Sequence, residues 1–417
     1  MKKKRSIISL CLSALFSLML LFTSFVKPVN AAPTITLEQT FTATANPDVV
    51  GKWSEVERLR VNDTNITQEL FITDNEHKTS TIVKGFGNDA SPNSQLFLLH
   101  KFAGWNTATK PYPVLFVHGA GSDGDFAVDP ERNGTTPGLA QSLAADGYAV
   151  FAITFAHPHG DNYIQREVLA AAIQRIKDIT GKTKVDLIAH SKGNMSSRMY
   201  VSDVKKSWGT AFRNDVRRYI QLGAPNGGID YTFRNTWAAW GIMATGAFGP
   251  VPYTYMTIYG WPTDTAYHSI YSAADGGGAY PGQAQMLARW DNVYDLDIFE
   301  QDWYTTYYGG WGYYSYSEGI DYAINQGGNL INTLKNTPVK STVQLATLAG
   351  SENVINGVVM EDDGPSDGVV FIASATMTDP MISGGATLLE KKVLPINHVQ
   401  LAYDPTALTW IKTQLSR

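Results

Sequence analysis

Cysteine is almost absent from the sequence, and the single one, Cys11, lies in a leader-like segment. Residues 2–5 are basic, residues 7–26 form an apolar run, and an Ala31-Ala32 pair follows. This order is typical of a signal peptide. An uncleaved membrane anchor is the alternative, since the run is just long enough to span a bilayer. Five interruptions of the run by serine and threonine favour cleavage. We therefore expect residues 1–31 to be removed, giving a secreted protein without disulfides or thiolate metal sites.

Positive charge is also scarce. The chain has 33 basic and 38 acidic residues, and five of the basic ones lie in the leader. The mature chain would keep 28 basic and 38 acidic residues, a formal charge of -10. Nucleic acid is therefore not an expected partner. No later segment is apolar enough to span a membrane, so we expect no stable membrane insertion after cleavage, and we expect a monomer.

Short apolar runs alternate with helical patterns from Tyr112 onward, after leading strands and loops at 32–110. The expected strands are 95–100, 114–117, 148–155, 185–189, 216–222, 343–349 and 369–373. The expected helices are 139–145, 166–180, 195–204, 318–334 and 405–415. Continuous apolar runs indicate strands that are buried on both faces. Their alternation with helices predicts an α/β fold, in which a mostly parallel central sheet carries helices on both faces.

Regular alternation stops between about 227 and 317, inside the catalytic region expected at 111–417. This segment is rich in glycine, proline and aromatic residues, and its tyrosines and tryptophans include Trp303, Tyr307, Tyr308 and Trp311. We interpret it as a cap inserted over the sheet edge where active sites lie. Tyrosine and tryptophan suit surfaces that are apolar on one side and wet on the other. These four residues are therefore candidate substrate contacts, although a cap with an aromatic core of its own would give the same composition.

Ser191 lies in a pattern that carries nucleophilic chemistry. The run Ala189-His190-Ser191-Lys192-Gly193 follows the expected strand 185–189 and precedes the expected helix 195–204. This arrangement indicates a nucleophile elbow, in which a serine on a sharp turn is exposed at the top of the sheet. Small residues two before and two after the serine let the backbones pass closely. A serine that only caps a helix is the simpler alternative.

The Ala-His-Ser-x-Gly run resembles the box of the bacillus-type secreted lipases and related class 2 lipases. The resemblance covers most of residues 110–415, is strong at the motifs and is weak in the aromatic insertion. It implies the α/β-hydrolase fold and a carboxylic-ester hydrolase. His118-Gly119-Ala120 also resembles these lipases, and this implies that the backbone N–H groups of Ala120 and Lys192 form the oxyanion hole. Two preorganised donors of this kind stabilise a tetrahedral intermediate.

The base and the acid are expected in the order serine, acid, histidine. That order leaves His268, in the aromatic insertion, and His398, in a loop before the last helix. Asn397-His398 resembles the ending of many bacterial lipases, so we assign His398 as the base. Asp367 resembles the acid of the Asp-Gly-x-Val stretch in the same lipases. Asp363 and Glu352 remain open as rivals for the acid.

Other clusters of polar residues receive a structural interpretation. Five aspartates that could suggest calcium lie in no ordered ligand loop and are interpreted as solvated charges: Asp123, Asp125, Asp291, Asp295 and Asp297. Four histidines invite a zinc interpretation, but the hydrolase motifs already account for two of them: His118, His157, His159 and His190. We expect neither a metal nor a cofactor.

The expected function is hydrolysis of a carboxylic ester through Ser191, Asp367 and His398. The substrate could be a lipid, a soluble ester, an insoluble polyester or an acylated cell-wall polymer. A different class of function also stays open, a non-catalytic aromatic-rich binding protein on a hydrolase fold. Labelling of Ser191 by a fluorophosphonate separates the two classes.

Overall fold

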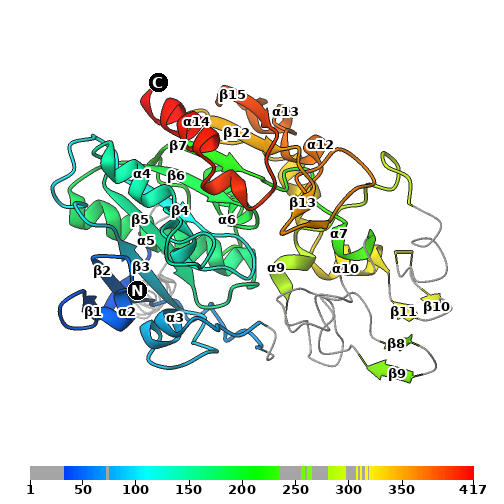
Figure 1. The fold of residues 1–417 in the computed structure, drawn as a ribbon, viewed down its shortest axis with the longest axis horizontal. Helices are drawn as coiled ribbons and strands as arrows, with labels where there is room; N and C mark the ends of the chain where they lie inside the picture. The colour runs from blue at the N-terminus through cyan, green and yellow to red at the C-terminus, as the bar shows by residue number, and fades with distance from the viewer. Residues whose placement is uncertain are drawn as a thin grey trace, which may run out of the picture. The chain divides into compact units, whose positions relative to one another are not determined.

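The computed structural model describes residues 32–71, 75–234, 255–258, 261–264, 280–296, 307–308, 310–311, 315–317 and 319–417. Within them, nine strands form one sheet in the order β1-β2-β3-β5-β4-β6-β7-β12-β15 (Figure 1). Their bounds are β1 (Ile35–Thr42), β2 (Glu55–Val61), β3 (Leu96–Lys101), β4 (Val114–Val117), β5 (Val150–Phe155), β6 (Val185–His190), β7 (Val216–Leu222), β12 (Gln344–Gly350) and β15 (Thr387–Leu394).

The strands from β5 to β15 pair in parallel, whereas β1, β2 and β3 pair antiparallel at one edge. All residues of β4, β5 and β6 are buried, because helices cover both faces of the sheet. The prediction of a mostly parallel central sheet is confirmed, and the strand order with its elbow after β6 is that of the α/β-hydrolase fold.

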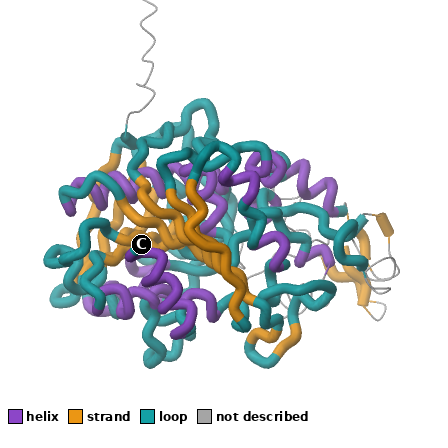
Figure 2. Tube along the Cα trace, turned by 90° about the horizontal axis from the view of Figure 1, so that it is seen from above, coloured by secondary structure: helices purple, strands orange, loops and turns teal. Residues whose placement is uncertain are grey.

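Two layers of helices cover the sheet, as Figure 2 shows. On one face, α4 (Leu139–Ala145) and α14 (Pro405–Ser416) pack into a single apolar cluster with side chains of β4 and β6. On the other face, α5 (Asn162–Thr180) and α6 (Gly193–Val201) pack into a second cluster with the alternate side chains of the same strands. None of the helices in the described part of the chain has the length and apolar character needed to cross a membrane.

The C-terminal part departs from the sequence-based expectation in three places. The helix expected at 318–334 is broken at Gly327-Gly328 into α10 (Ile320–Gln326) and α11 (Leu330–Lys335), since Gly328 adopts a φ of 68°. The strand expected at 369–373 is wrong: residues 372–375 form α12 (Ile372–Ala375). The strand at this edge of the sheet is β15, in which Leu394 is the only buried residue. Its Glu-Lys-Lys run hides the strand pattern, and charge of this kind is common on edge strands.

Short elements complete the described chain. They are α2 (Pro47–Val50), α3 (Ser80–Gly85), η1 (Gly124–Ala127), α7 (Tyr231–Arg234), α9 (Pro281–Ala284), β13 (Val354–Ile355), β14 (Val358–Val359), α13 (Asp379–Ile382) and η5 (Gln400–Ala402). Within the expected cap, a second sheet has the order β10-β11-β8-β9. Its strands are β8 (Tyr255–Ile258), β9 (Trp261–Asp264), β10 (Gly310–Trp311) and β11 (Ser315–Ser317).

Candidate active site

Ser191 lies directly after β6, at the C-terminal edge of the parallel strands. Its φ of 52° is in the left-handed region that non-glycine residues rarely adopt. A Cβ added to Gly193 would lie 2.5 Å from the carbonyl oxygen of His118, and one added to Gly119 would lie 2.8 Å from Ser191 Cβ. Glycine is therefore required where these backbones meet. The turn has the strained strand-to-helix geometry that a nucleophile elbow needs.

His398 and Asp367 meet although they come from two separate loops. His398 Nδ1 and Asp367 Oδ2 are 2.8 Å apart, and the backbone N–H of His398 donates to the carbonyl of Asp367 at 2.8 Å. Asp367 Oδ1 accepts the backbone N–H groups of Val369 and Val370 at 3.1 and 2.8 Å. Both residues are buried. A carboxylate fixed in this way makes Nδ1 the protonated nitrogen and leaves Nε2 to accept a proton.

The His398 ring lies beside the elbow. The backbone N–H of Ser191 donates to Leu222 O at 2.9 Å, and a Cβ on the next residue, Gly223, would lie 2.8 Å from His398 Nδ1. His398 Nε2 is buried and has no hydrogen-bond partner among the described residues. An unpaired buried nitrogen is costly in a structural role. It is the atom that a general base would turn toward the nucleophile, and such bonds often close only when substrate binds.

His190 supports the position of His398 through a contact with its backbone carbonyl, a role that the sequence did not reveal. Its Nε2 lies 2.8 Å from the carbonyl oxygen of His398, 208 positions away in the chain, and the two ring centroids are 4.9 Å apart. Burial, followed by the nearby His398, lowers the pKa of His190 to about 3. The neutral imidazole can therefore donate Nε2–H to a carbonyl, which only accepts. A contact over so long a stretch of chain has no local sequence signal.

The two backbone N–H groups expected to form an oxyanion hole belong to Ala120, which follows the Gly119 that packs on Ser191, and to Lys192, which follows Ser191 in the chain. Within the described residues, neither Ala120 nor Lys192 donates its backbone N–H to a protein acceptor. His118 fixes the loop that carries Ala120: its Nδ1 lies 2.7 Å from Gly119 O, and its Nε2 accepts the backbone N–H of Phe155 at 3.2 Å. Burial lowers the pKa of His118 to about 4, so this ring is neutral too. Both donors are free to bind an oxygen.

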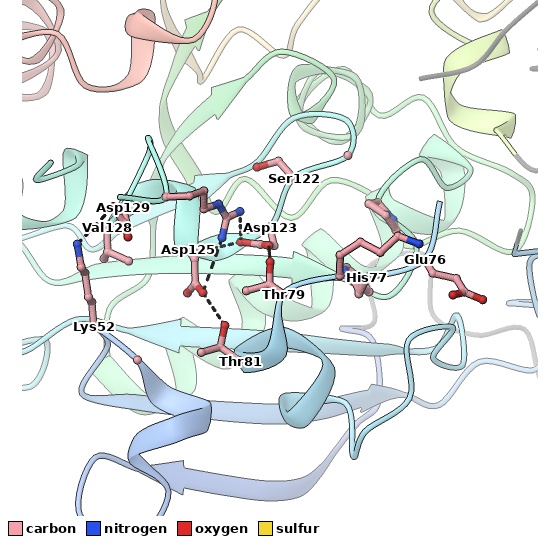
Figure 3. Close-up of a pocket in the computed structure, with 15 residues that line it drawn as sticks. Lys52, Glu76, His77, Thr79, Thr81, Ser122, Asp123, Asp125, Val128 and Asp129 are labelled. Atoms are coloured by element: carbon pink, nitrogen blue, oxygen red, sulfur yellow. Dashed lines mark hydrogen bonds and ion pairs between the residues drawn. The ribbon is translucent and has the colours of Figure 1, made fainter. Parts of the chain in front are cut away.

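An ion network fastens the far end of the same loop (Figure 3). Arg132 donates to Asp123 at 2.8 Å and lies 3.9 Å from Asp125, while Thr81 donates to Asp125 at 3.0 Å. Burial opposes ionisation of Asp123, but Arg132 outweighs it and lowers that pKa; burial and the charge of Asp123 raise the pKa of Asp125 to about 6. The two carboxylates thus share one guanidinium. They line a cavity of about 530 Å³ together with Ser122, two residues beyond Ala120.

The two rival acids have other partners. Asp363 accepts from Arg234 Nη1 at 2.8 Å, and the same guanidinium donates to Asp230. Asp363 therefore joins the loop of residues 360–371 that carries Asp367, the acid loop, to α7. Glu352 accepts the backbone N–H of Val354 at 3.1 Å in an exposed turn. Neither is bonded to His398. Among the three candidate carboxylates, the structure brings Asp367 to the base.

Asp367→Asn is expected to lower kcat by about a hundred- to ten-thousand-fold, because an amide at this position does not select the Nδ1-protonated tautomer or stabilise an imidazolium. Asp363→Asn should change kcat by less than about fivefold and act on thermal stability instead, since Arg234 keeps Asp230. Ester-hydrolysis kinetics and thermal unfolding of both variants check this. Equal small effects on kcat would mean that another carboxylate orients the histidine.

Glu361, at the start of the acid loop, is a buried carboxyl that should make stability depend on pH. Burial, followed by the charge of Asp230, raises its pKa from 4.5 to about 8, and its Oε2 has no hydrogen-bond partner among the described residues. In the unfolded chain the group ionises above its ordinary pKa, whereas in the folded protein it keeps its proton up to the raised value. This group's contribution to stability is therefore fully present below pH 4.5 and is lost as the pH rises through about 8.

Glu361→Gln should remove that loss, since glutamine stays neutral. The variant's Tm should lie close to that of the parent at pH 5 and several degrees above it at pH 8. Thermal unfolding at half-unit steps between these values measures the difference. A Tm difference that does not change with pH would show that the carboxyl ionises normally in the folded protein.

The four candidate substrate contacts in the cap differ in burial and in whether the structure describes them. Tyr307 is fully buried and donates its hydroxyl to Asp230 at 2.6 Å, so it belongs to the cap's own core, contrary to the expectation of a surface ring. Tyr308 is 56 % exposed and donates to Asp291 at 3.0 Å. Trp303, the side chain of Trp311 and the rival base His268 lie outside the described residues. Of the four rings, the structure thus shows one at the surface.

In the described part of the chain, no set of three or more histidine, aspartate or glutamate side chains has the arrangement of a metal site. Asp123 and Asp125 are paired with Arg132, and Asp291 is paired with Arg289 at 2.6 Å. These aspartates are therefore engaged in ion pairs and are not simply solvated.

Comparison with known proteins finds one family match and several similar solved structures. Residues 111–248, which contain the elbow and the Ala120 loop, match the family model of the class 2 lipases. The chain is similar to the mature form of a Bacillus licheniformis lipase, with 17 % identity over 73 % of this chain and 92 % of that one and a TM-score of 0.44. It is also similar to a gene product of Listeria innocua, with 13 % identity over 74 % and 95 % of the two chains and a TM-score of 0.38.

Proposed function

We propose that the protein is a secreted carboxylic-ester hydrolase, a lipase or esterase that works through an acyl-enzyme on Ser191. One observation carries the proposal: the buried pair of His398 and Asp367, 2.8 Å apart, lies beside a strained serine turn with two unused backbone donors. The match of residues 111–248 to the class 2 lipases supports the same chemistry. A binding protein would need neither the strain at the serine nor a buried histidine nitrogen without a partner.

In the first step Ser191 Oγ attacks the ester carbonyl carbon while His398 Nε2 takes its proton. Asp367 stabilises the imidazolium through Nδ1–H and keeps the ring oriented. The carbonyl oxygen becomes negative and is bound by the N–H groups of Ala120 and Lys192, which are fixed before the reaction and need no reorganisation. Collapse of the tetrahedral intermediate breaks the bond to the alcohol oxygen, and His398 returns the proton to that oxygen. The alcohol leaves, and the acyl group stays on Ser191.

Water completes the cycle by the same route. His398 Nε2 takes a proton from a water molecule, whose oxygen attacks the acyl carbon, and the same two N–H groups bind the second oxyanion. Breakdown of this intermediate returns the proton to Ser191 Oγ and releases the carboxylic acid. No group beyond these five residues is required by the chemistry.

For the substrate, we propose an ester with a large apolar part that contacts the cap. The support is the aromatic composition of residues 227–317 and the exposed ring of Tyr308. Burial of apolar surface against such a ring contributes about 25 cal/mol per Å².

We further propose export after cleavage at Ala31, on the basic and apolar pattern of residues 1–26. N-terminal sequencing of protein recovered from the medium should read from Ala32, and an intact leader there would contradict it.

A fluorophosphonate probe tests the proposed function directly. The probe should label the purified protein at one site, Ser191, identified by peptide mass spectrometry, and hydrolysis of emulsified triglycerides should exceed hydrolysis of a soluble acetate ester. Absence of labelling at Ser191 would favour the binding-protein alternative. Labelling with turnover of soluble esters alone would keep the mechanism and remove the substrate proposal.

A further inference from the structure

The side chain of Lys192 has no place in the mechanism above, although its backbone N–H does. It is 1 % exposed and ranks among the largest fully buried side chains. Its Nζ donates to Gln165 Oε1, in the first turn of α5, at 2.5 Å. Gln165 in turn donates to His157 O at 2.8 Å. The residue that follows the nucleophile is thus bonded to the loop between β5 and α5.

The base of the cap packs on the same side chain. A Cβ added to Gly282, in α9, would lie 2.7 Å from Lys192 Nζ, so the glycine backbone lies directly against the lysine. Gly282 is held there by two hydrogen bonds, from its own N–H to His159 O at 3.0 Å and from Asn162 Nδ2 to its carbonyl at 3.1 Å. The Lys192 side chain therefore packs between the elbow, the start of α5 and α9, which forms the base of the cap.

The pKa of the Lys192 ammonium group depends on its burial and on two acidic residues. Burial lowers its pKa to about 7, while Glu69 and Asp161 act in the opposite direction. Asp161 N donates to Glu69 Oε1 at 2.6 Å, so the two acidic residues are fastened to each other. Burial lowers the pKa values of His118 and His159, and the nearby charge of Lys192 lowers them further. An ammonium group is costly to bury, and the contacts with Gln165 and Gly282 compensate part of that cost.

We propose that the Lys192 side chain is a positioning group for the oxyanion hole: its bond to Gln165 and its packing under Gly282 hold its own backbone N–H in the donating orientation. The proposal rests on the proposed function. It also implies that the orientation of the Lys192 N–H depends on the position of α9. Any displacement of Gly282 would open the space that confines the lysine side chain. Loss of one oxyanion donor typically costs a hundred- to a thousand-fold in kcat, and a loosened donor should cost less.

Lys192→Met keeps the length of the side chain and removes its hydrogen bond and charge. We expect kcat on a soluble ester to fall by about 10- to 100-fold, KM to stay within about threefold, and the second-order rate of fluorophosphonate labelling to fall in parallel with kcat. Lys205→Met is the matched control, since it removes a partly exposed ammonium near the end of α6 that pairs with Asp203. This control should match the parent in all three measurements.

Gln165→Met is a second test of the proposal, because it removes the acceptor of the same hydrogen bond. If the two residues act through that bond, the double variant should lose no more kcat than the worse single variant. The inference is overturned if Lys192→Met keeps kcat within twofold of the parent, or if it only lowers Tm, or if the two losses multiply. In each of those cases an intact dependence on Ser191 would show that the proposed function stands without it.

Discussion

Ser191→Ala is expected to lower kcat/KM for ester hydrolysis by at least about ten-thousand-fold, because the variant has no nucleophile to form the acyl-enzyme. The fold should be unaffected. Alanine keeps the Cβ that packs on Gly119, and within the described residues the serine hydroxyl makes no hydrogen bond. The measurement is initial-rate kinetics on a soluble ester together with thermal unfolding. Activity above a few per cent of the parent, with contamination excluded by active-site titration, would remove Ser191 from the mechanism.

Ser191→Gly is a second variant with a distinct expectation. It should be equally inactive, and it should be at least as stable as Ser191→Ala, because glycine relieves the left-handed backbone at φ 52°. A non-glycine residue in that conformation costs about 1 kcal/mol or more. If the glycine variant were the less stable of the two, the strain at the elbow would not exist in solution.

His398→Ala is expected to be as severe as the loss of the serine, because it removes the group proposed to take the proton from Ser191 Oγ. This variant also leaves the buried carboxylate of Asp367 without its partner, which costs about 1 to 3 kcal/mol of stability. His398→Gln separates the two effects. Its amide could still donate to Asp367, so it should unfold at a higher temperature than the alanine variant and be just as inactive.

His268→Ala is the matched control for the base, because His268 is the other histidine that follows Ser191 in the chain. It should retain kcat within a fewfold of the parent. The reverse ranking, with His268→Ala inactive and His398→Ala active, would move the base into the insertion. It would leave the 2.8 Å contact between His398 and Asp367 as a purely structural pair.

Sequence alone determined most of the core, because its signals are local. The runs at 114–117 and 216–222 and the helix at 139–145 have the bounds that the structure gives to β4, β7 and α4. The run at 114–117 is continuously apolar and is buried on both faces, and the other two elements end at turn residues, Gly223 and the Asp146-Gly147 pair. The elbow is local in the same sense, since its strand, glycine and helix lie within ten residues of Ser191.

Sequence could name Asp367 and His398 only through order and resemblance, with Asp363 and Glu352 left open. Only the tertiary structure separated them, because one carboxylate accepts from His398 and another from Arg234, through contacts between distant loops. The burial of Tyr307, the support of His398 by His190 and the enclosure of Lys192 under Gly282 were decided in the same way. Hydrophobic periodicity reports which face of a segment is buried. It carries no information on which distant segment covers that face, and the partners of buried polar groups depend on that choice.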